Sequence, residues 1–217
     1  MRAPTPSADH AARHNKARVH RTSVLHLKRA DGVLAGVIDR VGPCRFQRRA
    51  QGTHFDALLR SIVYQQLSGK AAGTILARVL TLYGGRYPRP AQLLETSDDV
   101  LRTAGLSRQK LAYVRDLAAK VETGEVPLAR VGRMPDEEVI AHLTRVKGIG
   151  RWTAQMFLIF RLGRPDVLPE LDLGIQNAIQ RAYSLRTRPT PADVLRIGAT
   201  WRPHATIASW YLWRSLE

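Results

Sequence analysis

Apolar residues recur every three to four positions through most of the chain, and this spacing predicts amphipathic helices. The clearest run begins at Phe55 and continues at helical spacing with Leu58, Leu59, Ile62 and Val63. Residues so spaced share one face of a helix. No segment of any length alternates apolar and polar residues as a half-buried strand does, and no repeat of fixed period occurs. The pattern predicts an all-α protein of about ten helices.

The same periodicity and the local capping residues place the other helices. A basic segment, residues 1–22, shows no apolar periodicity and is predicted to be a disordered tail, although a cleaved organelle transit peptide would look similar. A short apolar segment follows. Further helices are then predicted from near Asp31 to residue 42, over 71–83, from Ser97, over 107–121, from Pro135, and over 173–183, 192–201 and 203–216.

The helix from Pro135 runs into Gly148-Ile149-Gly150, and a second apolar helix starts at once and continues through Phe160. A Gly-x-Gly at such a point indicates a tight hairpin, because only glycine takes positive φ or close backbone approach without steric cost. The second helix would begin with outward-pointing N–H groups, which attract an anion. Since Lys147 and Arg151 flank the glycines, the predicted anion is a nucleic-acid phosphate. An ordinary glycine-capped corner is the alternative.

The net charge of the chain indicates the kind of partner that it binds. The chain has 34 Lys and Arg residues and 18 Asp and Glu residues, for a formal net charge of +16. Such an excess is typical of proteins that bind a polyanion, and DNA, RNA and an anionic membrane all fit. No apolar run reaches the roughly 18 residues that span a bilayer, and no signal peptide is evident, so a soluble intracellular protein is expected. Binding to a polyanion should weaken steeply with salt.

Few residues can carry chemistry. The single cysteine, Cys44, excludes an internal disulfide and a four-cysteine metal site, and the seven histidines show no metal-ligand spacing. We therefore expect no transition metal. Asp172 follows Pro169 at the start of a helix, where it can be an N-cap, a reactive carboxylate, or both. The other candidates are the pair Gln65-Gln66 and the four tryptophans at 152, 201, 210 and 213.

Four motifs in order resemble the helix-hairpin-helix DNA glycosylases, specifically the 3-methyladenine DNA glycosylase II branch. They are FDALLRSIVYQQLSGKAA from Phe55, VKGIGRWTA from Val146, Asp172 twenty residues after Trp152, and WRPHATIASWYLWRS from Trp201. The resemblance covers about residues 50–217. It implies a glycosylase domain over 23–217, built as a two-lobed helical bundle with the hairpin at 139–162 and the active-site cleft between the lobes.

The resemblance also implies roles for individual residues. Asp172 corresponds to the catalytic aspartate, and Trp152 and Trp213 to aromatic residues of the substrate pocket. Met156 and Leu173 occupy pocket positions where the longer bacterial relatives have tyrosines, which implies a less aromatic pocket. Many relatives have an acidic residue immediately before the catalytic aspartate, where this chain has Leu171. Whether Glu170 substitutes for it stays open.

The remaining implied roles concern DNA. Gln66 corresponds to the residue that replaces the extruded base, and Ser68 to a neighbouring minor-groove contact. The backbone amides of Gly148, Gly150 and Thr153 would hold a phosphate beside Lys147 and Arg151. No cofactor is required. A structural Na⁺ or K⁺ is implied at the hairpin, on the carbonyls of Thr144, Val146 and Ile149.

The implied activity is hydrolysis of the N-glycosidic bond of an alkylated purine that has been flipped out of duplex DNA, as in base excision repair. The bifunctional branches have a nucleophilic lysine where this chain has Trp152, and an indole cannot form a Schiff base. A monofunctional, monomeric enzyme is therefore expected, without AP-lyase activity. It would be cytoplasmic and nucleoid-associated in a bacterium, or nuclear in a eukaryote.

Three other functions remain open. The protein can be a glycosylase for deaminated or oxidised bases, or a non-catalytic helix-hairpin-helix module that binds the DNA backbone. Asp172 and the two pocket tryptophans argue against the second, since phosphate binding needs neither. A basic helix on a membrane surface fits less well, because the charge is spread over the chain.

Overall fold

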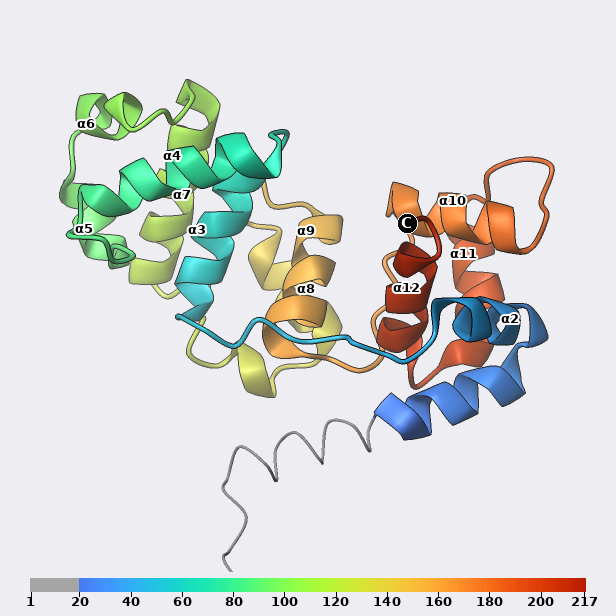
Figure 1. The fold of residues 1–217 in the computed structure, drawn as a ribbon. Helices are drawn as coiled ribbons and strands as arrows, with labels where there is room; N and C mark the ends of the chain where they lie inside the picture. The colour runs from blue at the N-terminus through green and yellow to red at the C-terminus, as the bar shows by residue number, and fades with distance from the viewer. Residues whose placement is uncertain (1–19) are drawn as a thin grey trace, which may run out of the picture. The chain divides into compact units, whose positions relative to one another are not determined.

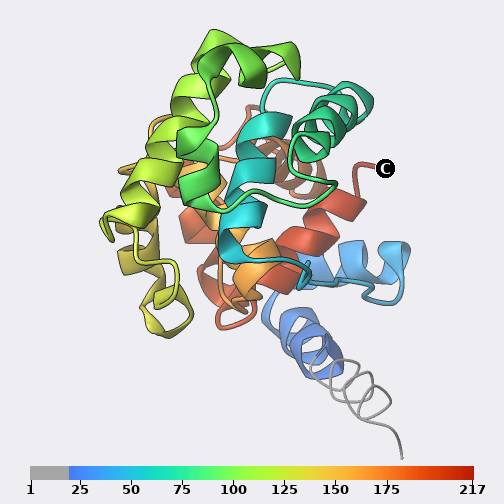
Figure 2. The ribbon, with the colours of Figure 1, turned by 90° about the vertical axis from the view of Figure 1, so that its left-hand side faces the viewer.

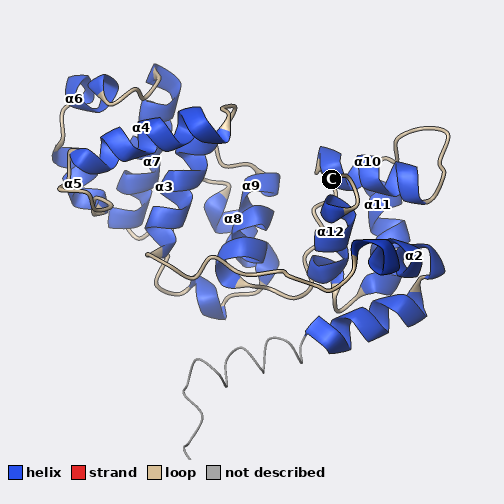
Figure 3. Ribbon diagram, in the orientation of Figure 1, coloured by secondary structure: helices blue, strands red, loops and turns tan. Residues whose placement is uncertain are grey.

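The computed structural model describes residues 20–217, and over this range the chain consists of helices and loops without a strand (Figure 3). The all-α prediction is confirmed. Within the same range, no helix combines the length and the apolar character needed to cross a membrane. Residues 1–19, to which most of the predicted tail belongs, lie outside the described residues.

The chain divides into two compact units. Residues 48–163 form one of them. Its helices are α3 (His54–Tyr64), α4 (Gly69–Thr81), α5 (Pro90–Glu95), α6 (Asp98–Thr103), α7 (Arg108–Glu122), the 3₁₀ turn η1 (Val131–Arg133), α8 (Asp136–Leu143), α9 (Arg151–Met156) and the π-helical turn η2 (Phe157–Leu162).

Helix α3 forms the centre of this unit's core. All five apolar residues of its predicted face are buried, and the helix packs against α4, α7 and η2 (Figure 1, Figure 2). Its start is specified locally by a capping box, in which the Thr53 side chain accepts the Asp56 N–H and the Asp56 carboxylate accepts the Thr53 N–H. Burial of the apolar face and the cap together explain why this segment was predictable.

The predicted hairpin is present as α8, the turn over 144–150, and α9. The expected single helix through Phe160 continues from α9 as the π turn η2, so its backbone pattern changes after Met156. Gly163 ends the turn in the left-handed conformation, with φ 71°.

The described residues of the other unit span 20–47 and 164–217. They form a helix over residues 20–30, then α2 (Gly32–Val41), α10 (Leu173–Ala182), α11 (Pro191–Ile197), the 3₁₀ turn η3 (Gly198–Trp201) and α12 (Ala205–Arg214). Helix α12 packs against both α2 and α10 (Figure 1).

The N-terminal boundary of the fold was predicted incorrectly. Residues 20–22, assigned to the tail, and the short segment after them are helical. The helix is anchored by Ser23 and Leu27, which lie one turn apart and are buried, whereas Leu25 is exposed. Two buried positions in eleven residues are too sparse a pattern to be recognised as an amphipathic helix.

Candidate active site

Asp172 is the N-cap of α10, as its position after Pro169 predicted. A turn closed by the hydrogen bond from the Asp172 N–H to the Pro169 carbonyl, 3.0 Å, leads into the helix. The Asp172 Oδ1 atom accepts the backbone N–H of Ile175 at 2.8 Å. The carboxylate therefore lies at the positive end of the α10 dipole, held by the helix that follows it.

A second donor reaches the same oxygen. Trp213, near the end of α12, donates its indole Nε1–H to Asp172 Oδ1 at 2.9 Å. The sequence predicted Trp213 as a pocket aromatic, and this hydrogen bond was not foreseen. It joins α12 to the cap of α10, and no local signal in the sequence links two residues 41 positions apart.

The residues before Asp172 differ in their exposure. The Glu170 side chain is buried, and Leu171 is exposed. The Glu170 carbonyl accepts the side-chain amide of Gln176 at 3.0 Å, which ties the turn to α10. Glu170 thus lies at a buried position of the turn and does not occupy the exposed position that Leu171 takes.

Gly148 is required by the hairpin for two reasons. Its φ is 80°, in the left-handed region, and a Cβ built at this position would lie 2.1 Å from a ring carbon of Tyr113. Gly150 differs, because its φ is −91° and no atom lies within 4 Å of a built Cβ. Contacts within the protein therefore explain why residue 148 is a glycine. The backbone at Gly150 has no such contact and is accessible to an external group.

Carboxylates accept hydrogen bonds from the backbone of Lys147 and from the side chain of Arg151, the two basic residues at the hairpin. The backbone N–H of Lys147 donates to Asp116 Oδ2 at 2.8 Å. Arg151 binds Glu137 through two hydrogen bonds, 2.7 and 2.8 Å, and this hydrogen bonding holds the pKa of Glu137 below its usual range. The predicted DNA contact by Arg151 would compete with this exposed ion pair.

The corner between α3 and α4 is connected to the hairpin. The Gln65 side chain donates to the Gly148 carbonyl at 2.8 Å. Gln66, the predicted plug, is exposed and has a φ of 56°, which is unusual for a residue other than glycine. Ser68 is the N-cap of α4, where its hydroxyl accepts the Ala71 N–H. A structural role therefore accompanies its predicted minor-groove contact.

The other predicted pocket residues belong to both units. Trp152 and Met156 lie on α9, in the unit of residues 48–163, and Trp152 is exposed. Leu173 is the first residue of α10 in the other unit and is exposed as well. Thr153 has a buried side chain, which leaves only its backbone N–H for the predicted phosphate contact.

The implied monovalent cation is compatible with the residues present, because backbone carbonyls are a donor class that Na⁺ and K⁺ accept. The Val146 carbonyl accepts the Ile149 N–H at 3.0 Å, and its second lone pair can take another partner. Among residues 20–217, no group of three or more His, Cys, Asp or Glu side chains is placed to hold a metal ion.

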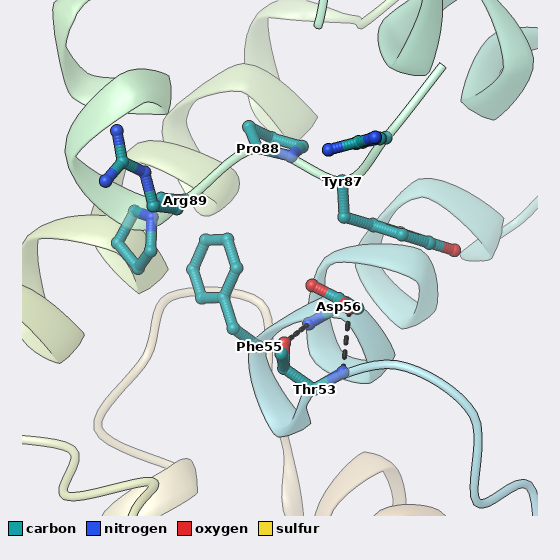
Figure 4. A pocket seen from close by; sticks show the side chains of 8 residues that line it. Thr53, Phe55, Asp56, Tyr87, Pro88 and Arg89 are labelled. Carbon is teal, nitrogen blue, oxygen red and sulfur yellow. Dashed lines mark hydrogen bonds between the residues drawn. The ribbon is translucent and has the colours of Figure 1, made fainter. Parts of the chain in front are cut away.

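A surface pocket of roughly 440 Å³ lies at the start of α3 (Figure 4). Phe55 and Asp56 face it from α3, and Tyr87, Pro88 and Arg89 from the loop before α5. The Asp56 carboxylate there is engaged in the α3 cap. None of the predicted site residues lines this pocket, so it supports no assignment to the site.

Comparison with known proteins agrees with the resemblance seen in the sequence. Residues 59–203 match the family model described as HhH-GPD superfamily base excision DNA repair protein. The chain is 34% identical over 194 residues to DNA-3-methyladenine glycosylase 1 of Schizosaccharomyces pombe, covering 88% of this chain and 85% of that protein. It is 29% identical over 192 residues to the alkylbase DNA glycosidase-like protein mag2 of the same yeast, covering 87% and 90%.

Solved structures are also similar over most of the chain. The S. pombe 3-methyladenine DNA glycosylase Mag1, in complex with abasic DNA, superposes with a TM-score of 0.79 at 33% identity, covering 88% of this chain and 95% of that one. The DNA-3-methyladenine glycosidase from Bacillus halodurans gives a TM-score of 0.80 at 38% identity, with coverages of 88% and 87%.

Proposed function

Because the chain belongs to the HhH-GPD superfamily of base excision DNA repair proteins, we propose that it is a DNA glycosylase that removes alkylated purines of the 3-methyladenine type from duplex DNA. The observation that carries the proposal is the Asp172 carboxylate, which two N–H donors hold at the start of α10. The relatives named as 3-methyladenine glycosylases support the substrate class, and the abasic DNA bound to one of them supports the nucleic-acid partner.

The reaction needs a fixed negative charge beside the sugar. The N-glycosidic bond breaks with its electron pair leaving on the base, and the deoxyribose becomes oxocarbenium-like. Water then adds to the anomeric carbon and loses a proton, which yields the free base and an abasic site. Asp172 would stabilise the positive charge that develops on the sugar and orient the water.

The substrate class fits such a site. A purine alkylated at N3 already carries positive charge, so it leaves without strong acid catalysis. The exposed indole of Trp152 offers an electron-rich face to a cationic base, a contact worth about 1–2 kcal/mol when desolvated. Met156 and the exposed Leu173, at the other two pocket positions that the resemblance implies, are not aromatic.

The unit of residues 48–163 would make the DNA contacts. The N–H groups at the start of α9, with the open backbone at Gly150, would hold a phosphate. The carbonyls of Thr144, Val146 and Ile149 would hold a Na⁺ or K⁺ ion, which would add positive charge to the phosphate site. Gln66, exposed at the tip of its turn, would fill the space of the extruded base and partly offset the unstacking cost.

We also propose that the enzyme is monofunctional, since Trp152 has no amine to attack the sugar. Borohydride reduction during turnover should trap no covalent protein–DNA adduct, and the abasic product should remain uncut until alkali is added. A trapped adduct would contradict this part of the proposal.

The proposal is tested by the release of free bases from duplex DNA treated with dimethyl sulfate, followed by chromatography. Asp172→Asn keeps an oxygen that accepts the Ile175 and Trp213 donors but removes the charge. It should lower 3-methyladenine release about 100-fold or more while duplex binding is retained. Asp193→Asn makes the same change in the capping box of α11, where the Asp193 carboxylate accepts the Thr190 N–H, and should leave release unchanged.

Failure of the unmodified protein to release any alkylated base would refute the substrate assignment. A panel of deaminated and oxidised bases would then distinguish another glycosylase from a DNA-binding module.

A further inference from the structure

Two elements hold one oxygen of the proposed catalytic carboxylate. Asp172 Oδ1 accepts the Ile175 N–H of α10 at 2.8 Å and the Trp213 indole N–H of α12 at 2.9 Å. We propose that Trp213 is a positioning residue of the glycosylase, which contributes to the reaction through its indole N–H by fixing the orientation of the Asp172 carboxylate. This inference rests on the proposed function and refines it, because the family resemblance implied only an aromatic wall.

A single N-cap bond would leave the carboxylate poorly oriented. The terminal torsion of an aspartate is broad, so one donor on Oδ1 tolerates a range of carboxylate planes. The second donor comes from a different helix and approaches the same atom. The plane of the carboxylate, and with it the direction of Oδ2, is then set by the packing of α12 against α10. A hydrogen bond from a neutral donor to a charged acceptor is also stronger than one between neutral groups.

Gly174 provides the space that this contact needs. A Cβ built at Gly174 would lie 3.0 Å from Asp172 Oδ1, 3.2 Å from Trp213 Cδ1 and 3.4 Å from Trp213 Nε1. Its φ is not positive, so the backbone does not call for glycine, and glycine is a poor helix former. A Cβ at this position would therefore have to displace the carboxylate or the indole by a few tenths of an ångström.

The two roles of Trp213 make different predictions for Trp213→Phe. Phenylalanine keeps an aromatic face but has no N–H. If Trp213 acted by stacking on the base, Trp213→Phe would keep nearly the activity of the unmodified protein, and only Trp213→Ala would lose activity. If the N–H positions Asp172, both variants lose activity to a similar extent. Loss of one hydrogen bond to a charged group corresponds to about 10- to 100-fold in rate.

The first experiment observes the contact itself. The four indole N–H signals in a ¹H–¹⁵N spectrum are assigned by single Trp→Phe variants of the full chain. Asp172→Asn should shift the Trp213 signal most, because it neutralises that indole's acceptor. The Trp210 signal, from the same helix, serves as the matched reference. Equal small changes at all four indoles would overturn the inference, whatever the enzyme's substrate.

The second experiment measures single-turnover release of 3-methyladenine and duplex affinity for Trp213→Phe, Trp213→Ala, Gly174→Ala and the control Trp210→Phe. We expect the rate to fall about 10- to 100-fold for both Trp213 variants with affinity within about twofold, an intermediate loss for Gly174→Ala, and no loss for the control. Activity of Trp213→Phe equal to the unmodified protein would overturn the inference, while the proposed function would stand. A loss that matches a fall in melting temperature would assign Trp213 a structural role instead.

Discussion

Replacing Asp31 with alanine should destabilise the unit that contains α10 and α12. Asp31 caps α2, where its Oδ1 accepts the Leu34 N–H at 2.9 Å. Its Oδ2 accepts the Trp201 indole N–H at 2.8 Å and the Tyr183 hydroxyl. Burial opposes ionisation of Asp31, but these hydrogen bonds outweigh it and hold its pKa below the ordinary value. Burial and the Asp31 charge raise the pKa of Tyr183.

The size of the effect follows from the groups left without an acceptor. Trp201 is fully buried, so its orphaned N–H costs about 1–3 kcal/mol. The half-buried Tyr183 hydroxyl would add about 1 kcal/mol and the lost helix cap about another 1 kcal/mol. Asp31→Ala should therefore lower the free energy of unfolding by about 3–5 kcal/mol, which is a large part of a typical total.

Urea titration followed by tryptophan fluorescence measures this loss, since three of the four tryptophans lie in the same unit. Asp31→Asn keeps one oxygen acceptor, so it should lower the free energy of unfolding by about half as much as Asp31→Ala. Because the folded-state pKa of Asp31 is lowered, its contribution is present above the unfolded value near pH ~3.9 and is lost as the pH falls through the folded value. A loss below about 1 kcal/mol for Asp31→Ala would refute the reasoning.

Two further predictions concern the hairpin and the histidines. Gly148→Ala should lower both the melting temperature and the duplex affinity, because the φ of Gly148 is 80° and the Tyr113 ring occupies the space of a Cβ. Gly150→Ala should lower the duplex affinity alone, because no such contact exists there. Thermal melts and binding titrations of both variants check this. Burial and the neighbouring His26 lower the pKa of His204. The stabilising contribution of neutral His204 is complete above the unfolded-state pKa of ~6.5, and it is lost as the pH falls through the folded-state pKa. Between pH 7 and pH 5, the melting temperature should therefore fall less for His204→Gln than for the unmodified protein.

The fold was predictable where burial follows a local period. The apolar faces of α3 and α8 are buried as their spacing indicates, and the capping box of α3 lies next to that helix in the sequence. The helix over 20–30 was missed for the opposite reason. Only Ser23 and Leu27 of that helix are buried, and the exposed Leu25 obscures the period. Residues whose burial depends on distant partners leave no periodic signal.

The candidate site was predictable in its local part only. Asp172 was placed at a helix start because Pro169 and the following apolar run mark one. The family resemblance implies that Trp213 is a pocket aromatic, but the identity of a residue does not reveal that its indole N–H is the second donor to Asp172. The contact from Gln65 to Gly148 spans 83 positions, and it depends on how α3 packs beside the hairpin. Such hydrogen bonds are consequences of tertiary packing.

The unit thus contains two N-cap aspartates that each accept an indole N–H, Asp31 from Trp201 and Asp172 from Trp213. Their environments differ, because Trp201 is fully buried while Trp213 is only partly buried. Removing the N–H by Trp→Phe should therefore separate the two roles. Trp201→Phe should lower the free energy of unfolding by about 1–3 kcal/mol and leave the rate of base release per folded molecule unchanged. Trp213→Phe should lower the rate with a stability change of less than about 1 kcal/mol. If both variants lost only stability, the Asp172–Trp213 contact would be a second structural cap, and the carboxylate would not need the indole for the reaction.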